Sequence, residues 1–75
     1  MKPTMGRIVI YKQAAHEAPH NATREHPAIV THVYTDDYVN LMVFFDSGPV
    51  AACTSIHRTG VALEGSPSWD WPQRD

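Results

Sequence analysis

The stretch VNLMVFF (residues 39–45) decides the fold. Its side chains alternate between two sets with a period of two residues, which is the period of a β-strand. One set is entirely apolar and is expected to fill a core: Val39, Leu41, Val43 and Phe45. The other set contains Asn40, but also Met42 and Phe44, so the opposite face of the same strand is largely apolar too.

Four further segments are typical of strands, because they are short, rich in β-branched or aromatic residues, and bounded by turn-forming residues. Their sequences are GRIVIYK (6–12), PAIVTHVYT (27–35), VAACTSIH (50–57) and WDW (69–71). Pro27 suits the first position of a strand, where no amide donor is needed. DDY (36–38) and DSGP (46–49) are expected to be turns. No segment has the pattern of an amphipathic helix.

Five short strands in one 75-residue domain (residues 1–75) predict an all-β fold. Exposed edge strands promote aggregation, and closing the sheet removes them. We therefore predict a small five-stranded SH3-like barrel in which residues 13–26 form a long loop after the first strand. The alternative is an open five-stranded meander.

Composition limits the classes of partner. The net charge is −2 and the acidic and basic residues are interspersed, so neither nucleic acid nor an anionic membrane is a favoured partner. A single cysteine, Cys53, excludes an internal disulfide and fits a reducing cytosol. The apolar run near the N-terminus is too short for a signal peptide or a membrane span.

Residues 16–20 (HEAPH) match the H-E-x-x-H pattern of zinc metalloproteases. That motif requires a helix, because only a helix places both imidazoles on one face. Pro19 lies between the two histidines and disfavours a helix by about 3 kcal/mol or more. A site would also need a third ligand, for which His26 is the only nearby candidate. We interpret the segment as a polar loop and predict no metal site.

Other candidates for catalysis are weak. Cys53 and His57 share a face of their predicted strand but lie about 13 Å apart along it, so Cys53 is expected to be a small buried hydrophobe. Asp36 and Asp37 are expected to be solvated in a turn. We predict no catalytic residue, no cofactor and no enzymatic activity.

The excess of apolar surface is the strongest functional signal. Met42 and Phe44 are expected to face outward, and exposed Met and aromatic residues are enriched at protein interfaces. Trp69 and Trp71 are expected to share a face, and either join this surface or close the core from below. Tyr34 and Tyr38 are candidate rim contacts. The alternative is that the long loop or the C-terminal tail covers these side chains.

Four quoted segments resemble very small proteins encoded by tailed bacteriophages and prophages: GRIVIY (6–11), AIVTHV (28–33), VNLMVF (39–44) and WDWP (69–72). The resemblance covers the chain from about Gly6 to Pro72, and residues 13–26 are where such proteins would differ most in length. It implies a phage gene product made in the bacterial host cytoplasm, acting on host machinery or entering the virion. It implies no catalytic residues.

These observations favour a non-enzymatic protein-binding module that modulates or inhibits a host bacterial protein. The predicted interface comprises Met42, Phe44, Trp69, Trp71, Tyr34 and Tyr38, and its partner is a host or virion protein or a second copy of the chain. Two alternatives stay open. One is a structural virion component, either decorating the capsid or associated with the tail. The other is an oligomer that binds a small ligand between subunits.

Overall fold

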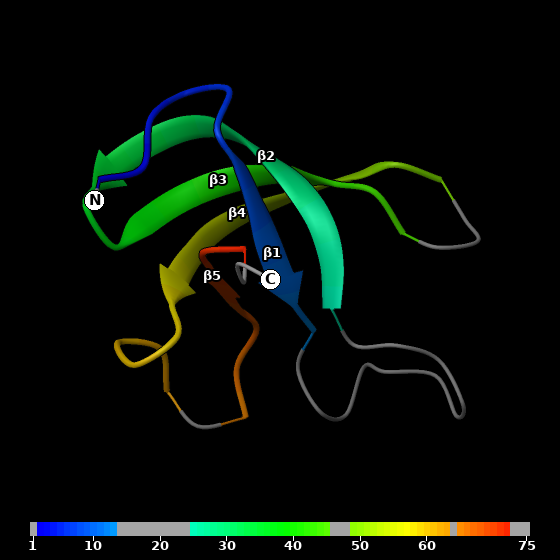
Figure 1. Cartoon of the computed structure of the whole chain (residues 1–75). Helices are drawn as coiled ribbons and strands as arrows, with labels where there is room; N and C mark the ends of the chain where they lie inside the picture. Colours follow the sequence, from blue (N-terminus) through cyan, green and yellow to red (C-terminus); the bar gives the residue numbers. More distant parts are fainter. Residues whose placement is uncertain (1, 14–24, 46–48, 64, 73–75) are drawn as a thin grey trace.

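The computed structural model describes residues 2–13, 25–45, 49–63 and 65–72. Within these ranges the chain forms five strands and no helix: β1 (Ile8–Lys12), β2 (Glu25–Thr35), β3 (Tyr38–Val43), β4 (Ala51–Arg58) and β5 (Ser68–Asp70). The strands close into a barrel in sequence order, as Figure 1 shows. The predicted all-β, five-stranded barrel is confirmed. The open meander is wrong, because β5 pairs with β1 and with β4.

The closure of this barrel requires one parallel seam. In a closed barrel, every neighbouring pair of strands can be antiparallel only if the number of strands is even. Here β1 to β4 are antiparallel to their neighbours and β5 is antiparallel to β1. The remaining β4–β5 pair is parallel and joins only two residue pairs, His57 with Ser68 and Arg58 with Trp69. The odd number of strands therefore requires a parallel pair, and in this barrel it is the short β4–β5 seam.

The core follows the alternation predicted for β3. Val39, Leu41 and Val43 are buried, and Phe45 packs against the core from just beyond the strand. The inward positions of the other strands complete the buried cluster: Val9, Tyr11, Ala28, Val30, Ile56 and Trp69. Each strand thus contributes one apolar face to the inside, as a barrel requires.

Two β-bulges opposite Asn40 bend the sheet so that it can close. The β2–β3 register shifts between Val30 and His32, and the β3–β4 register shifts between Val39 and Leu41. Ser55, on β4 at the second bulge, has a left-handed backbone with φ 60°. Its amide donates to the side-chain Oδ1 of Asn40 at 2.8 Å. Bulges increase local twist and curvature, and the strong curvature of β2 is evident in Figure 1.

The strand boundaries differ from the predictions by one or two residues. β2 begins at Glu25, so Pro27 lies inside the strand rather than at its start. The carbonyl of Pro27 accepts a hydrogen bond from the Phe44 amide, just beyond the end of β3. The N–H group that proline lacks would therefore lie at the end of the β2–β3 ladder. Its absence there removes little of the hydrogen bonding between the two strands. Tyr38, predicted as part of a turn, belongs to β3.

The turn between β2 and β3 ties the barrel shut at the seam. The backbone carbonyl of Asp37 accepts hydrogen bonds from the backbone amide of Arg58 at 2.7 Å and from the indole Nε1 of Trp69 at 3.1 Å. The Asp37 carboxylate accepts a third from Nε of Arg58 at 2.5 Å. Nearby, the Thr59 amide donates to the Trp69 carbonyl at 2.8 Å. One turn residue therefore holds both strands of the parallel pair.

We predict that Trp69→Phe lowers the free energy of unfolding by about 2 kcal/mol or more. The variant loses one hydrogen bond, worth about 1 kcal/mol, and leaves a cavity in a site that is 0% exposed. The matched control is Trp71→Phe, at a half-buried side chain, which should cost clearly less. Urea unfolding followed by circular dichroism measures both, and equal losses would contradict this placement of Trp69.

Asn40→Ala is expected to destabilise the protein by about 1 kcal/mol, because it removes the acceptor of the Ser55 amide at the bulge. Thr54→Ala, at an exposed position of the same bulge, is the control and should change stability by less than about 0.5 kcal/mol. Thermal unfolding of the two variants decides the point. An unchanged melting temperature in Asn40→Ala would show that the bulge does not depend on this bond.

Candidate protein-binding surface

A row of apolar side chains crosses four strands on the outside of the barrel. The strand registers pair Ile8 with Ile29, Ile29 with Met42, and Met42 with Ala52. Residues paired across neighbouring strands lie on the same face of a sheet. Because the core faces of these strands are occupied by other residues, the row lies outside. Ile8, at its β1 end, is 55% exposed.

A second apolar row lies beside the first. Ile10 pairs with Pro27, and the Phe44 amide bonds to the Pro27 carbonyl, so these three residues continue the same face. Val50 immediately precedes β4 and is 50% exposed. We call these eight residues the outer apolar block: Ile8, Ile10, Pro27, Ile29, Met42, Phe44, Val50 and Ala52. None of them carries a charge.

Polar residues bound the outer apolar block at both ends. At one end Lys12 pairs with Glu25 across β1 and β2. At the other end Asn40 and the bulges interrupt the apolar pattern. With strands about 4.8 Å apart and alternate residues about 7 Å apart, the block covers on the order of 300 Å². An apolar centre with a polar margin is the composition of protein interfaces.

The predicted outward orientation of Met42 and Phe44 is consistent with the structure. Phe44 is 39% exposed, while Met42 is half-buried between Ile29 and Ala52 on the outer face. The two side chains are therefore not sealed beneath the rest of the described chain.

Trp69 requires a correction. Its side chain is 0% exposed, so it is a core residue and the prediction that it belongs to an interface is wrong. The physical reason is its position at the seam, where the indole fills the barrel and donates to the Asp37 carbonyl. Trp71 is half-buried and meets the Trp69 ring edge-on at 5.1 Å. The guanidinium of Arg7 lies 5.6 Å from the Trp71 ring, at cation–π distance.

Tyr34 and Tyr38 belong to a row of rings at the far end of the barrel. Ring centroids lie 4.5 Å apart for His32 and Tyr34, 5.1 Å for Tyr34 and Tyr38, and 4.3 Å for Tyr38 and His57. Tyr34 is 51% exposed, and its hydroxyl accepts a hydrogen bond from the Asn40 side chain. The bulges at Asn40 separate this row from the outer apolar block, so the two tyrosines do not adjoin Met42 and Phe44.

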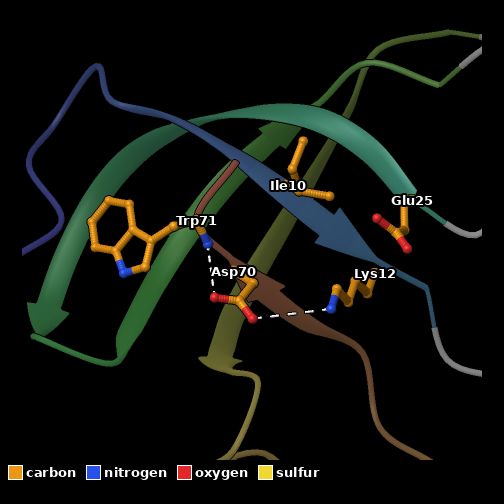
Figure 2. Close-up of a pocket in the computed structure, with 5 residues that line it drawn as sticks. All are labelled: Ile10, Lys12, Glu25, Asp70 and Trp71. Carbon is orange, nitrogen blue, oxygen red and sulfur yellow. Dashed lines mark hydrogen bonds and ion pairs between the residues drawn. The ribbon is translucent and has the colours of Figure 1, made fainter. Parts of the chain in front are cut away.

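A small open pocket adjoins the outer apolar block at Ile10. Its volume is about 210 Å³. Figure 2 shows its five lining residues, from β1, β2, β5 and the residue after β5: Ile10, Lys12, Glu25, Asp70 and Trp71. The Lys12 ammonium lies 4.0 Å from the Asp70 carboxylate, whose other oxygen accepts the Trp71 amide at 2.8 Å. Two carboxylates and one ammonium give the lining a net negative charge.

The other residues considered for chemistry occupy separate places. Residues 16–20, with the H-E-x-x-H match, lie outside the described residues. His26 is buried on β2 and donates from Nε2 to the Gln13 side-chain oxygen at 2.9 Å. Cys53 is half-buried and packs against the core. Among the residues that the structure describes, no three His, Cys, Asp or Glu side chains gather to hold a metal ion.

The Asp36-Asp37 turn differs in part from the expectation of two solvated carboxylates. Asp36 is exposed, but Asp37 is engaged by Arg58. The hydrogen bond from Arg58 to Asp37, and then the charge of that carboxylate, raise the pKa of the Arg58 guanidinium. Arginine is already protonated at any physiological pH, so this ion pair serves the seam rather than proton transfer.

Six residues of the outer apolar block were not predicted as interface residues. The signal for Ile8 and Ile10 was present, because they alternate with Val9 and Tyr11 in the first segment. The other four residues could be found only from the strand register: Pro27, Ile29, Val50 and Ala52. A search for strands with two apolar faces would find β1 and β3, but it could not show that both pair with β2 and so share one surface.

Comparison with protein-family models finds no match. Neither the curated proteins nor the solved structures provide one. The part of the chain described by the structure also holds no helix of the length and apolarity that a membrane crossing requires.

We predict that Leu41→Ala lowers the free energy of unfolding by about 2–5 kcal/mol, whereas Met42→Ala costs less than about 1.5 kcal/mol. The two residues are neighbours on β3, but Leu41 is 1% exposed and Met42 lies on the outer face. Chemical denaturation of both variants measures the difference. Similar losses at the two positions would mean that Met42 is part of the core.

Proposed function

We propose that the protein is a non-enzymatic binding module that contacts a protein partner through its outer apolar block. The observation that carries the proposal is the pair of uncharged rows that crosses β1 to β4, with Ile8 at 55% and Phe44 at 39% exposure. A barrel needs only one apolar face per strand to fill its core. Apolar residues on the second face have no role in that core and favour association.

The rigidity of the sheet supports the same function. Six of the eight block residues lie in paired strands, and Phe44 and Val50 directly flank β3 and β4, so little backbone freedom is lost when a partner covers the block. Aliphatic and aromatic side chains on a fixed frame are typical of the centres of protein interfaces. Ile8 and Phe44 are the most suitable anchors, because they are exposed in the free protein.

The size of the block bears on the kind of contact. Burying on the order of 300 Å² of apolar surface yields at most about 7–8 kcal/mol at 25 cal/mol per Å². Association itself costs about 4–15 kcal/mol, and a standard interface buries about 800 Å² on each partner. The outer apolar block therefore serves as the centre of an interface, and the partner gains further contacts at its margins.

The resemblance to phage-encoded proteins directs the search for that partner. We propose that the partner is a bacterial host protein in the host cytoplasm. The module modulates or inhibits this protein. No separate observation on the described residues favours a virion component or a small-ligand oligomer over this proposal.

The test is a capture experiment with the double variant Ile8→Ser/Phe44→Ser. The wild-type protein is expected to retain one bacterial protein reproducibly from host lysate, and the double variant is expected to lose at least about nine-tenths of that capture. Loss of two interface anchors typically costs more than 1 kcal/mol each, which is a factor of about ten or more. Both residues are exposed, so the variant should fold.

The matched control is Tyr34→Ser, which removes an equally exposed ring at the far end of the barrel. It should leave the capture unchanged. Circular dichroism checks the fold of every variant, and sedimentation of the wild-type protein alone shows whether a second copy occupies the block. Undiminished capture by the folded double variant would overturn the proposal, as would the appearance of the protein only in purified phage particles.

A further inference from the structure

The first part of β4 has an edge that no described strand covers. The β4–β5 seam involves only His57 and Arg58 of β4. Residues 51–56 therefore pair with β3 on one side and with no described strand on the other. Backbone N–H and C=O groups along such an edge can pair with a strand of another chain.

The hydrogen bonds of β3 show which backbone groups face this edge. In an antiparallel strand, successive residues direct their N–H and C=O groups alternately to the two neighbouring strands. The Phe44 amide donates to the Pro27 carbonyl, so it faces β2. By the same alternation, the backbone groups of Val43 and Leu41 face β4.

The alternation continues on β4. Ala51 and Cys53 are the partners of Val43 and Leu41, so their backbone groups face β3. Ala52 lies between them and therefore directs its N–H and C=O to the uncovered edge. Val50 and Thr54 continue this pattern on either side of Ala52. All three have exposed side chains on the outer face.

This edge, which we call the β4 edge (residues 50–54), is short and has defined ends. Pro49 has no N–H to donate, and Ser55 leaves the extended conformation with φ 60°. The β4 edge is therefore centred on Ala52. No residue from 49 to 56 is charged, so two identical edges can meet without placing like charges opposite each other.

We propose that the protein self-associates by antiparallel pairing of the β4 edges of two copies. Ala52 then lies opposite the partner's Ala52, and Val50 lies opposite the partner's Thr54. This register uses the outward-directed backbone groups of all three residues. Two identical antiparallel strands are related by a two-fold axis perpendicular to the sheet. Both copies therefore present the same outer face on the same side.

The two-fold axis joins the apolar rows of the two copies. Ala52 ends the row that begins at Ile8 and passes through Ile29 and Met42, so the row continues directly into that of the second copy. The exposed apolar surface grows from on the order of 300 Å² to about 600 Å², near the 800 Å² or so that a standard interface buries on each side. A foreign strand would satisfy the same backbone groups but would add no second block, so the area favours a second copy.

The use of this joined surface for a host protein rests on the proposed function, whereas the self-association does not. The edge contact alone is smaller than a standard interface. We therefore expect a weak dimer, with a dissociation constant on the order of 0.1 mM.

The experiment is sedimentation equilibrium of the full chain between about 10 µM and 1 mM, a range that brackets the expected dissociation constant. Amide hydrogen exchange, followed by nuclear magnetic resonance at the two ends of this range, locates the contact. Exchange of the Ala52 amide is expected to slow at the higher concentration. Exchange of the Asp36 amide, in the distant β2–β3 turn, should not change.

Ala52→Pro removes the central donor of the β4 edge without removing a bond to β3. It is expected to weaken the dimer at least about tenfold, because both copies lose the donor and proline excludes close pairing. Ala52→Ser is the matched control, since it keeps the N–H group and a small side chain, and it should dimerise like the wild-type protein. Circular dichroism checks the fold of both variants.

A pair of charge variants tests the register and does not depend on the fold of the proline variant. Ala52→Lys alone and Ala52→Glu alone should each weaken the dimer about threefold or more, because like charges lie opposite each other at the two-fold axis. An equimolar mixture should form a heterodimer at least as tight as the wild-type dimer.

A wild-type protein that stays monomeric at 1 mM would overturn the inference, as would a mixture of the charge variants that pairs no better than either alone. A dimer that persists in Ala52→Pro but is lost in Ile8→Ser/Phe44→Ser would also overturn it, because the second copy would then cover the outer apolar block. A monomer that still captures a host protein would leave the proposed function standing. An edge dimer that captures none would remove the proposed function and keep this inference.

Discussion

The backbone carbonyl of Asp37 is the acceptor on which the closed barrel depends. It binds the Arg58 amide of β4 and the Trp69 indole of β5, the two strands that share only two residue pairs. A five-stranded barrel must contain a parallel pair, and this pair is too short to hold itself. The turn between β2 and β3 therefore replaces the ladder hydrogen bonds that the seam lacks. The large buried indole adds packing to the same point.

Closure also explains why the outside of the barrel is available for binding. Once the inward faces of the strands meet, the core is complete, and the outward apolar residues of β1 to β4 have no counterpart inside. The bulges at Asn40 bend the sheet and divide its outer surface in two. One side carries the outer apolar block and the pocket, and the other carries the ring row of Tyr34 and Tyr38. The same curvature that closes the barrel thus defines the edges of the proposed interface.

The sequence predicted the fold well and the site in part, for a physical reason. Alternation along residues 39–45 reports which side chains share a face, so it correctly placed Leu41 inside and Phe44 outside. Alternation does not report which strands are neighbours, so it could not assemble Ile8, Ile29 and Met42 into a row. It also could not distinguish Trp69 from an exposed tryptophan, because a three-residue strand has too few residues to define its buried face. The pocket depends on residues from opposite ends of the chain.

The pairing of Ile10 with Asp70 has a consequence for biosynthesis. These partners are 60 residues apart (70 − 10), so a growing chain can form the β1–β4 meander but cannot complete the cylinder until Trp69 and Asp70 have been made. Contacts of such long sequence separation form slowly. Until then the inner faces of the nascent strands remain accessible to solvent and to chaperones. Shortened translation products that stop before Trp69 would lack most of β5, so the barrel could not close. Such products would be readily recognised by proteases.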